Sequence, residues 1–219
     1  MQLHIEASLT IKFPGLQVLL QALDDVTITR TTTSLEELKK SIAEEIKSKY
    51  TLESLKDVPI FRAYRDFFWR AGIDPTKIRP AAEALIRRIL ANKPLPTINT
   101  LVDAYNLASI KTGVALAAFD RKELQGTLLM RTAKAGEEFH GIGMNKPMQL
   151  NGGEIVVLDA TKLIAVYPYR DADKSKVTEQ TKNIMLMICG CPGIEQAPLL
   201  EAQHVACDFI TRYCQERLS

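Results

Sequence analysis

The sequence predicts an α+β fold, because the helical and strand-like patterns fall in different parts of the chain. Between residues 34 and 112, apolar residues recur at the spacing of amphipathic helices. Between residues 114 and 188 they form short runs separated by turn signals such as Asn151-Gly152-Gly153. Helices that do not alternate with strands argue against a sheet built from βαβ units. We therefore expect N-terminal strands and helices, followed by a mixed or antiparallel β core with flanking helices.

The N-terminal segment is expected to contain strands. Residues Gln2 to Leu9 alternate between apolar and polar positions, which is the pattern of a half-buried strand. Phe13-Pro14-Gly15 predicts a turn, and residues Leu16 to Ile28 predict at least one further strand. This start lacks the charged region and apolar block of a signal peptide, and no apolar run is long enough to span a bilayer. We therefore expect a soluble, cytoplasmic protein.

Three helices are expected next. Ser34 and Glu37 form a capping box at the head of the first helix. The apolar stripe of this helix consists of Leu35, Leu38, Ile42 and Ile46. A second helix begins at Pro59, covers residues 61–71 and ends at Gly72, and a third runs from Pro80 to Asn92.

A stiff connector, Lys93 to Pro96, separates two subregions of the chain. Residues 1–94 hold the N-terminal strand and the basic helices, and residues 95–219 hold the β-rich core. A fourth helix is expected from Ile98 to Thr112, with Gly113 as its stop. We expect the two subregions to form one integrated structural domain.

The second subregion is expected to supply the β core. Its strand-like runs cover residues 114–119, 127–132, 154–158 and 162–167. A short helical turn near residues 175–181 leads into a buried strand at 184–188. A long amphipathic helix is expected over residues 198–218.

Positive charge is concentrated in one segment of an otherwise nearly neutral chain, whose net charge is +2. Between Ile60 and Lys93, eight basic residues stand against three acidic ones. Local charge steers a polyanion more than the total does, and guanidinium groups interleaved with aromatic rings suit RNA. The RNA-binding candidates are Arg62, Arg65, Arg70, Arg79, Arg87 and Arg88.

The same segment also has a packing interpretation. Phe61, Tyr64 and Phe68 fall on one face of the predicted helix, and Trp69 falls on the neighbouring face with two of the arginines. A core stripe beside a solvated arginine face is the more common meaning of such a pattern. Both interpretations stay open from the sequence.

Polar residues at helical spacing mark a second feature. Asn99, Asp103 and Asn106 lie at i, i+4 and i+7, so they share one face of the fourth helix. If buried, they must form hydrogen bonds, and a structural network is favoured over a binding surface. Of the three histidines, only His140, in the loop AGEEFHGIGMNK, is a candidate for a site role, although a lone histidine in a loop is more commonly a surface residue.

The cysteines are not expected to bind a metal. The four possible zinc ligands are Cys189, Cys191, His204 and Cys207. The Cys-x-Cys spacing is not the common structural-zinc pattern, and the apolar neighbours suit ordinary buried thiols. The sequence also lacks a Gly-x-Ser-x-Gly elbow and a phosphate-cradling glycine loop. We therefore expect reduced thiols, no metal and no cofactor.

The segment LVDAYNLASIKTGVALAAFD resembles the helix-to-strand signature of the B3/B4 domain of the phenylalanyl-tRNA synthetase β subunit. The matching positions are Asp103, Asn106, Gly113 and Phe119-Asp120. Further similar features follow in order: Arg131-Thr132-Ala133, Gly136-Glu137, the run from Glu154 to Asp159, and SKVTEQTKNIMLM. The resemblance covers roughly residues 95–189 and extends weakly back through FRAYRDFF and RPAAEAL.

This resemblance implies a domain that receives the acylated end of tRNA and hydrolyses the ester of a wrongly attached amino acid. It places Asp173 where the synthetase domain has an acidic residue that reads the polar end of the amino acid. It places Ala117 where the family has its editing-site histidine. It also puts Tyr167 to Arg170 in place of a glycine-rich approach. These departures leave the specificity of the pocket open.

The leading hypothesis is a freestanding B3/B4-type protein that hydrolyses mischarged aminoacyl-tRNA in trans. The catalytic candidates are Asn106, Arg170 and Asp173, and the substrate-binding candidates are Asp103, Ala117, His140 and Tyr169. The expected partner is the aminoacylated acceptor end of tRNA, without membrane or DNA, and the number of subunits stays open. The alternatives are a non-catalytic tRNA-binding module and a protein that binds an amino acid or peptide in the same pocket.

Overall fold

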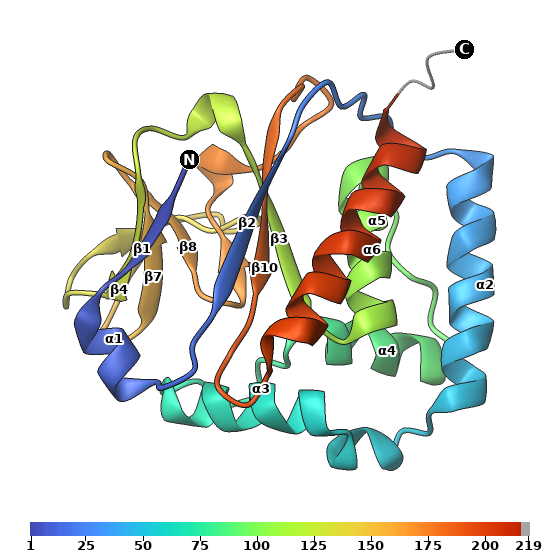
Figure 1. Cartoon of the computed structure of the whole chain (residues 1–219), viewed down its shortest axis with the longest axis horizontal. Coiled ribbons are helices and arrows are strands. Elements are labelled where there is room, and N and C mark those ends of the chain that lie inside the picture. Colours follow the sequence, from blue (N-terminus) through green and yellow to red (C-terminus); the bar gives the residue numbers. More distant parts are fainter. Residues whose placement is uncertain (216–219) are drawn as a thin grey trace.

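A three-stranded antiparallel sheet lies in the middle of the molecule (Figure 1). The computed structural model describes residues 1–215. The sheet contains β2 (Val18–Leu23), β10 (Ile184–Cys189) and β3 (Ala115–Asp120), with β10 in the centre. All six residues of β10 are buried, because protein covers both of its faces. The prediction of a buried strand at residues 184–188 is confirmed.

A five-stranded sheet lies on one side of the central sheet (Figure 1). Its strands, in spatial order, are β1 (Leu3–Ile5), β4 (Leu128–Thr132), β7 (Ile155–Leu158), β8 (Leu163–Val166) and β9 (Arg170–Asp171). The β1–β4 pair is parallel and the other pairs are antiparallel. A small hairpin adds β5 (Glu138–Phe139) and β6 (Met148–Gln149). The predicted strands of the β core are confirmed, with ends that shift by a residue.

Helices cover the other side of the central sheet. α5 (Thr100–Thr112) and α6 (Gln196–Cys214) pack against it, while α2 (Thr33–Lys49) and α4 (Ala81–Leu90) lie against α5. α3 (Pro59–Arg70) runs below these elements in Figure 1. None of the helices within residues 1–215 combines the length and apolar character that a bilayer span requires. The α+β class is confirmed, and elements from both sides of residue 94 share the two larger sheets.

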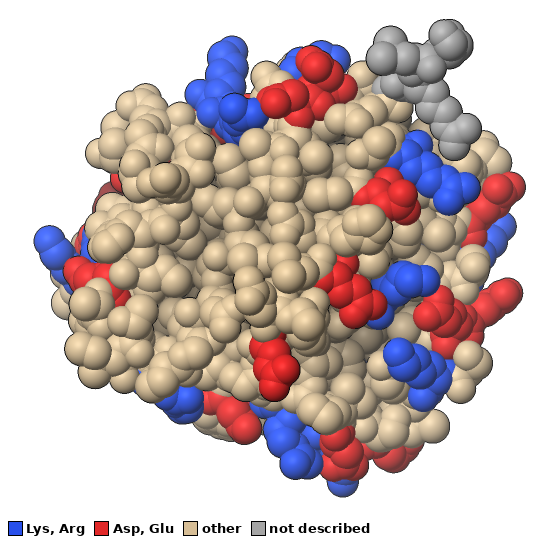
Figure 2. Space-filling view, in the orientation of Figure 1, with Lys and Arg blue, Asp and Glu red and all other residues tan. Residues whose placement is uncertain are grey.

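Charged side chains are unevenly spread over the face seen in Figure 2. They lie mainly over the helical half and along the edges, whereas the middle of this face is largely uncharged. The candidate RNA-binding arginines of α3 and α4 belong to the helical half.

The N-terminal strand is shorter than predicted. β1 ends at Ile5, and residues Ala7–Lys12 form the short helix α1. Leu9 and Phe13, four residues apart, are both 1% exposed. A helix buries both side chains on one face, whereas a continued strand does not bring positions four apart together in this way. The alternation of residues 2–9 therefore predicted a strand correctly up to Ile5 and wrongly beyond it.

Several boundaries differ from the predicted ones. α2 begins after Thr32, whose side-chain oxygen accepts a hydrogen bond from the Leu35 amide at 3.3 Å, so the cap lies two residues before Ser34. α5 begins after Asn99 rather than at Ile98. The helical turn predicted at residues 175–181 is instead a single 3₁₀ turn at Asp173–Ser175. The last residues of the predicted C-terminal helix, 216–218, lie outside the described part of the chain.

The aromatic stripe of α3 belongs to the core. Phe61, Tyr64 and Phe68 are at most 1% exposed, which confirms the packing interpretation for that face. The Tyr64 hydroxyl accepts a hydrogen bond from the Ala115 amide at 3.0 Å and donates one to the Cys189 carbonyl. α3 is thereby fastened to the ends of β3 and β10, and its other face is left for solvent.

Candidate functional site

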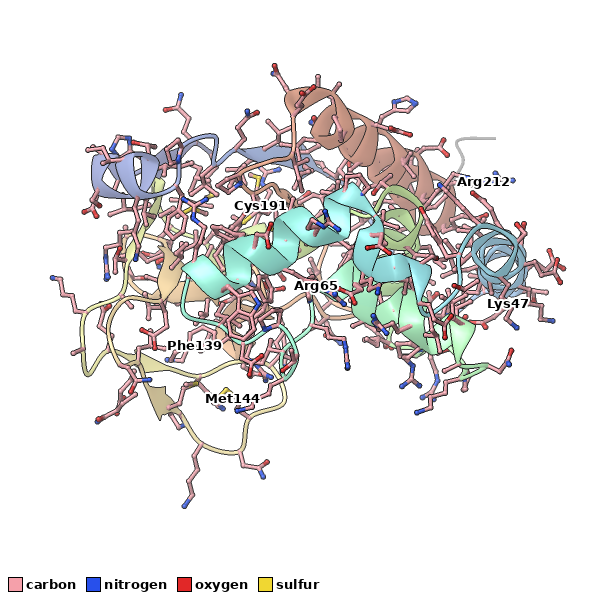
Figure 3. The ribbon with its side chains drawn as sticks, turned by 90° about the horizontal axis from the view of Figure 1, so that it is seen from below. Lys47, Arg65, Phe139, Met144, Cys191 and Arg212 are labelled. Atoms are coloured by element: carbon pink, nitrogen blue, oxygen red, sulfur yellow. The ribbon has the colours of Figure 1, made fainter. Side chains whose placement is uncertain are left out.

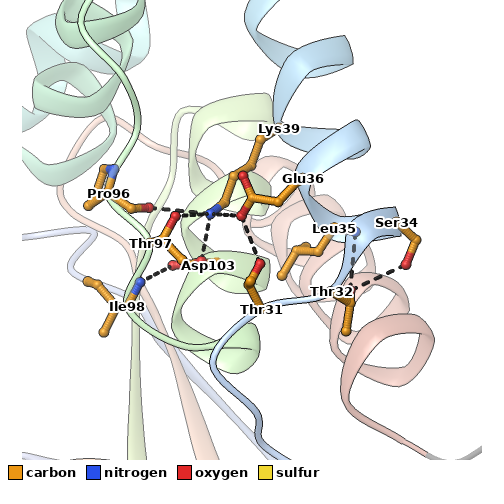
Figure 4. Close-up of polar contacts among 10 residues, drawn as sticks. All are labelled: Thr31, Thr32, Ser34, Leu35, Glu36, Lys39, Pro96, Thr97, Ile98 and Asp103. Carbon is orange, nitrogen blue, oxygen red and sulfur yellow. Dashed lines mark hydrogen bonds and ion pairs between the residues drawn. The ribbon is translucent and has the colours of Figure 1, made fainter.

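Asp103 on α5 is buried and forms an ion pair with Lys39 on α2 (Figure 4). The Lys39 ammonium nitrogen lies 2.7 Å from the Asp103 carboxylate and 2.8 Å from that of Glu36. It also donates to the Thr97 hydroxyl at 3.0 Å. The other Asp103 oxygen accepts the Ile98 amide at 3.1 Å. The network joins α2, α5 and the connector between α4 and α5.

Both members of this buried pair have shifted pKa values. Burial opposes the charged form of Lys39, but its bonds to Asp103 and Glu36 outweigh burial and raise its pKa. Burial raises the pKa of Asp103 by more than the pairing lowers it. The carboxylate therefore depends strongly on its lysine partner in this environment.

The polar face of α5 only partly forms the network expected from the sequence. Asp103 takes part, but Asn99 instead caps the helix, its side-chain oxygen accepting the Val102 amide at 2.9 Å. Asn106 lines a cavity of about 10 Å³ together with Asp103 and Lys39. A space of this size holds about one water molecule. It is too small for an amino acid.

A second group of predicted site residues lies beside β9. The His140 carbonyl accepts the Asp173 amide at 2.9 Å, so these two residues are neighbours. The His140 ring forms a 2.7 Å hydrogen bond with the Met144 carbonyl. The Asp173 carboxylate pairs with Lys176 at 2.7 Å and is half-buried.

Arg170 lies over the same loop. Its guanidinium donates to the Ile142 carbonyl at 3.2 Å, and its aliphatic stem lies so close to Gly141 that a side chain at position 141 would clash with it. Tyr169 precedes it and is half-buried, and burial raises its pKa. The structure thus places four predicted residues together: His140, Tyr169, Arg170 and Asp173.

A hollow of about 220 Å³ opens at this place. Its lining consists of Glu138, Phe139, His140, Pro147, Lys162, Leu163, Ala172 and Lys174. An apolar floor with a few charged groups at the rim is typical of small-molecule sites, although this volume is below their usual range of roughly 300–1,000 Å³. The space suits a ligand no larger than an amino acid.

Asp171, which sequence reasoning did not select, is the acidic residue of β9, and its pKa is strongly raised. It is half-buried, and burial alone raises its pKa to about 7. Its charge also reaches α5, where burial first and Asp171 second raise the pKa of Tyr105. Tyr105 stands between Asp103 and Asn106 in sequence. Tyr105 of α5 therefore lies near Asp171 of β9, whereas Asp103 and Asn106 line the small cavity beside Lys39.

Ala117 lies inside β3 and is 7% exposed. Its partner in the sheet register is Met187 of β10. A methyl group can neither donate nor accept a proton. The position that the resemblance assigned to a histidine therefore brings no acid or base to the site.

Two of the six RNA-binding candidates are paired with a buried carboxylate. Arg65 and Arg87 both bond to Glu83, whose side chain is fully buried, with Nε–oxygen distances of 2.8 and 2.6 Å. Burial raises the pKa of Glu83, but the two guanidinium groups outweigh it and lower the pKa. Figure 3 shows Arg65 between α3 and α4. Neither arginine is an unpaired surface cation.

The other candidates differ in their surroundings. Arg70 donates to the Lys12 carbonyl at 2.8 Å and lies over the Phe13 ring, and Arg62 is paired with Asp57 at 3.4 Å. Arg79 and Arg88 line a hollow of about 460 Å³ beside α4. The other residues of this lining are Leu52, Lys77, Ala84, Arg87, Ala91 and Lys93. No acidic side chain belongs to this lining as described.

The polar residues of the β core mainly hold loops in place. Arg131 pairs with Glu137 through both guanidinium nitrogens, and Glu137 also accepts the Lys134 amide at 2.6 Å. Asp159 accepts the Gln125 amide at 3.0 Å and pairs with Lys162 at 2.8 Å. Within residues 1–215, no group of three or more histidine, cysteine or acidic side chains is placed to hold a metal ion.

Glu137→Gln should make the free energy of unfolding vary less with pH in the acidic range. The Arg131 hydrogen bond lowers the pKa of Glu137 from 4.5 to about 2. The resulting stabilisation is present above pH 4.5 and is lost as the pH falls through about 2. At neutral pH the variant should lose about 1–2 kcal/mol of unfolding free energy in urea titrations. The exposed neighbour variant Glu138→Gln should lose almost nothing, and equal losses in the two variants would contradict the prediction.

With this geometry in view, comparisons with known proteins identify the domain. Residues 63–215 match the B3/4 domain family. The chain belongs to this family. The resemblance recognised in the sequence is thereby confirmed, and α2 lies outside the matched region of the chain.

Individual relatives agree with this assignment. The B3/4 domain is 30% identical over 117 residues to the phenylalanine–tRNA ligase β subunit of Fusobacterium nucleatum, covering 53% of this chain and 14% of that subunit. It is also 30% identical over 115 residues to the corresponding subunit of Nocardia farcinica, covering 52% of this chain and 13% of that one. The chain thus matches about a seventh of the length of these relatives.

A solved structure has the same fold. It is an N-terminal fragment of the phenylalanyl-tRNA synthetase β subunit from Pyrococcus horikoshii, with a TM-score of 0.51 and 11% sequence identity. The alignment covers 98% of this chain and 49% of that fragment. At this identity the similarity concerns the fold alone, and it includes the N-terminal part of the chain.

Proposed function

We propose that this B3/4 domain binds tRNA and hydrolyses the ester bond of wrongly charged aminoacyl-tRNA in trans. The observation that carries the proposal is the half-buried Asp171 on β9, with a pKa near neutrality, in a domain similar to parts of phenylalanine–tRNA ligases. A carboxyl group of this kind can accept a proton at the pH at which it works.

An aminoacyl ester needs little chemical help to react with water. In the proposed reaction, water attacks the carbonyl carbon while the Asp171 carboxylate takes a proton from it. The ester C–O bond then breaks, and the proton passes to the departing ribose oxygen. Arg170, which is exposed and lies on the opposite face of β9 from Asp171, neutralises the terminal phosphate of the tRNA.

The remaining residues of the β9 group select and hold the amino acid. Asp173 pairs with Lys176 in the free protein, so an α-ammonium group would exchange one cation for another at this carboxylate. Tyr169 and His140 border the amino-acid side, with His140 lining the 220 Å³ hollow. Asp103 and Asn106 support the site indirectly, because they help to fix α5 against α2 through the cavity beside Lys39.

A panel of aminoacyl-tRNAs tests this function. Each is mixed with the protein, and release of the amino acid is followed against buffer and against heat-inactivated protein. We expect faster release from at least one member of the panel, because the Asp171 carboxylate would draw a proton from the water that attacks the ester. Release no faster than in buffer for every member would refute the deacylase.

A second candidate function is tRNA binding without hydrolysis. Ala117 favours it, because β3 there offers no proton-transferring group where the family resemblance implies a histidine. Salt-dependent binding of tRNA, without release of amino acid from any member of the panel, would select this candidate.

A further inference from the structure

The cationic surface of this domain extends beyond the segment that the sequence singled out. A second hollow, of about 380 Å³, opens between α2 and α4. Its lining consists of Glu36, Lys39, Lys40, Ala43, Lys47, Ile89, Asn92, Lys93, Pro94 and Leu95. Lys93 lines both this hollow and the 460 Å³ hollow beside α4, so the two hollows are neighbours on the surface. We call them together the α2–α4 groove.

Most cations of this groove are not neutralised by the protein itself. Lys39 and Arg87 belong to the buried pairs described above, and Lys77 lies 3.9 Å from Asp74. For the other five, no carboxylate within residues 1–215 lies within ion-pair distance. These five are Lys40, Lys47, Arg79, Arg88 and Lys93. Glu36 is the one acidic residue of the described lining, and it is engaged by Lys39.

The groove is also shaped for a backbone rather than for bases. Arg88 is held in place by two hydrogen bonds to the Pro94 carbonyl, at 3.1 and 2.9 Å, so its charge has a fixed position. Small side chains along the lining leave room for a ligand to approach the protein backbone; they are Ala43, Ala84 and Ala91. No aromatic side chain belongs to the described lining. Proteins that bind single strands stack bases on aromatic rings, whereas helical RNA is held through its phosphates and hydroxyl groups.

We propose that the α2–α4 groove binds the phosphate backbone of a base-paired RNA stem, with α2 and α4 contributing cations on its two sides. The proposal rests on the proposed tRNA-binding function and adds to it a partner surface, α2, that lies outside the family match at residues 63–215. Lys40 and Lys47, both exposed, are the α2 residues that contact the stem. Lys47 lies near the end of α2 that is seen at the right of Figure 3.

The test compares charge reversal in the groove with the same reversal elsewhere. Lys40→Glu with Lys47→Glu is the groove variant. Lys122→Glu with Lys182→Glu, exposed on another part of the fold, is the matched control. Binding of an RNA hairpin that mimics an acceptor stem is measured by fluorescence anisotropy over a range of salt concentrations. Thermal melting of each variant verifies folding, and Lys40→Gln with Lys47→Gln repeats the test without added negative charge.

We expect the groove variant to bind the hairpin at least about tenfold more weakly, and to lower the slope of log affinity against log salt by about two, one for each lost phosphate contact. The control should retain the wild-type values. If both groove variants bind the hairpin with the affinity and the salt slope of the wild type, the groove is not the RNA-binding surface. The proposed tRNA-binding function would not be affected by that result. Tighter binding of a single-stranded oligonucleotide than of the hairpin would overturn the proposal that the groove binds a base-paired stem. If the wild type binds neither the hairpin nor tRNA, the proposed function itself fails.

Discussion

Lys39→Met should lower the free energy of unfolding by about 3–5 kcal/mol, because it leaves the Asp103 carboxylate buried without its cation. Asp103 is 2% exposed, and Lys39 is its ion-pair partner, at 2.7 Å. The substitution keeps the length and the apolar stem of the lysine, so the loss reports the charge rather than a cavity. Urea titration at neutral pH measures it. Lys40→Met, at the exposed neighbouring position, should change the value by less than about 0.5 kcal/mol.

A double variant separates the ion pair from the packing around it. Lys39→Met with Asp103→Leu removes both charges together, and its stability should return to near that of the wild type or above it. Glu36 then loses its main partner but can turn to solvent, since its side chain is 40% exposed. A double variant as unstable as Lys39→Met alone would show that the charge of Asp103 is not the cause.

The network around Lys39 also shows what a sequence can indicate about a buried site. Leu35, Lys39, Ile42 and Ile46 follow one another at helical spacing, and all four are buried in the structure. The lysine therefore lies on the apolar stripe of α2, which was a signal available before the structure. Its partner is 64 positions away along the chain, so no local pattern could name it. A charged residue on an apolar stripe predicts a partner without identifying it.

Elements with one dominant local pattern were predicted well. β10 is apolar throughout and buried throughout, and Gly113 ends α5 with a φ of +78°, a conformation that glycine adopts without strain. α1 failed because residues 2–9 fit a strand period, while the helical period is visible only in Leu9 and Phe13. Two residues at the end of a segment give too little evidence for a helix when the preceding alternation is strong.

The candidate site was predicted in part for a similar reason. The resemblance indicated Tyr167 to Arg170 and Asp173, and the structure brings Asp173 together with His140. The resemblance did not indicate Asp171, because the chemistry of that carboxyl depends on burial by distant parts of the chain. The arginines pose the opposite problem. Their charge is evident in the sequence, but only the fold reveals that Glu83 neutralises Arg65 and Arg87.

Asp171→Asn should abolish most of the hydrolysis while making the protein more stable. If Asp171 is the proton acceptor, its amide replacement should slow ester hydrolysis by about 10²–10⁴-fold in single-turnover measurements. Wild-type hydrolysis should increase as the pH rises through about 7, where the carboxyl loses its proton. The variant should lack this increase. Asp208→Asn, an exposed change of equal charge on α6, should leave the rate and its pH dependence unchanged.

The stability of the same variant provides the second readout. The folded-state pKa of Asp171 is raised from 3.8 to about 7, so the folded protein holds this proton more tightly than the unfolded chain does. Its contribution is therefore favourable below pH 3.8 and is lost as the pH rises through about 7. Above that pH the asparagine variant should be more stable than the wild type by about 2–4 kcal/mol, and the difference should shrink in acid. A gain in stability with unchanged hydrolysis would mean that Asp171 is a buried acid without a catalytic role, whereas loss of both would indicate a damaged fold. Only a variant that is both more stable and much slower in hydrolysis supports the proposal. That result would mean that the burial of the Asp171 carboxylate destabilises the fold and that the same carboxylate accepts the proton in the reaction.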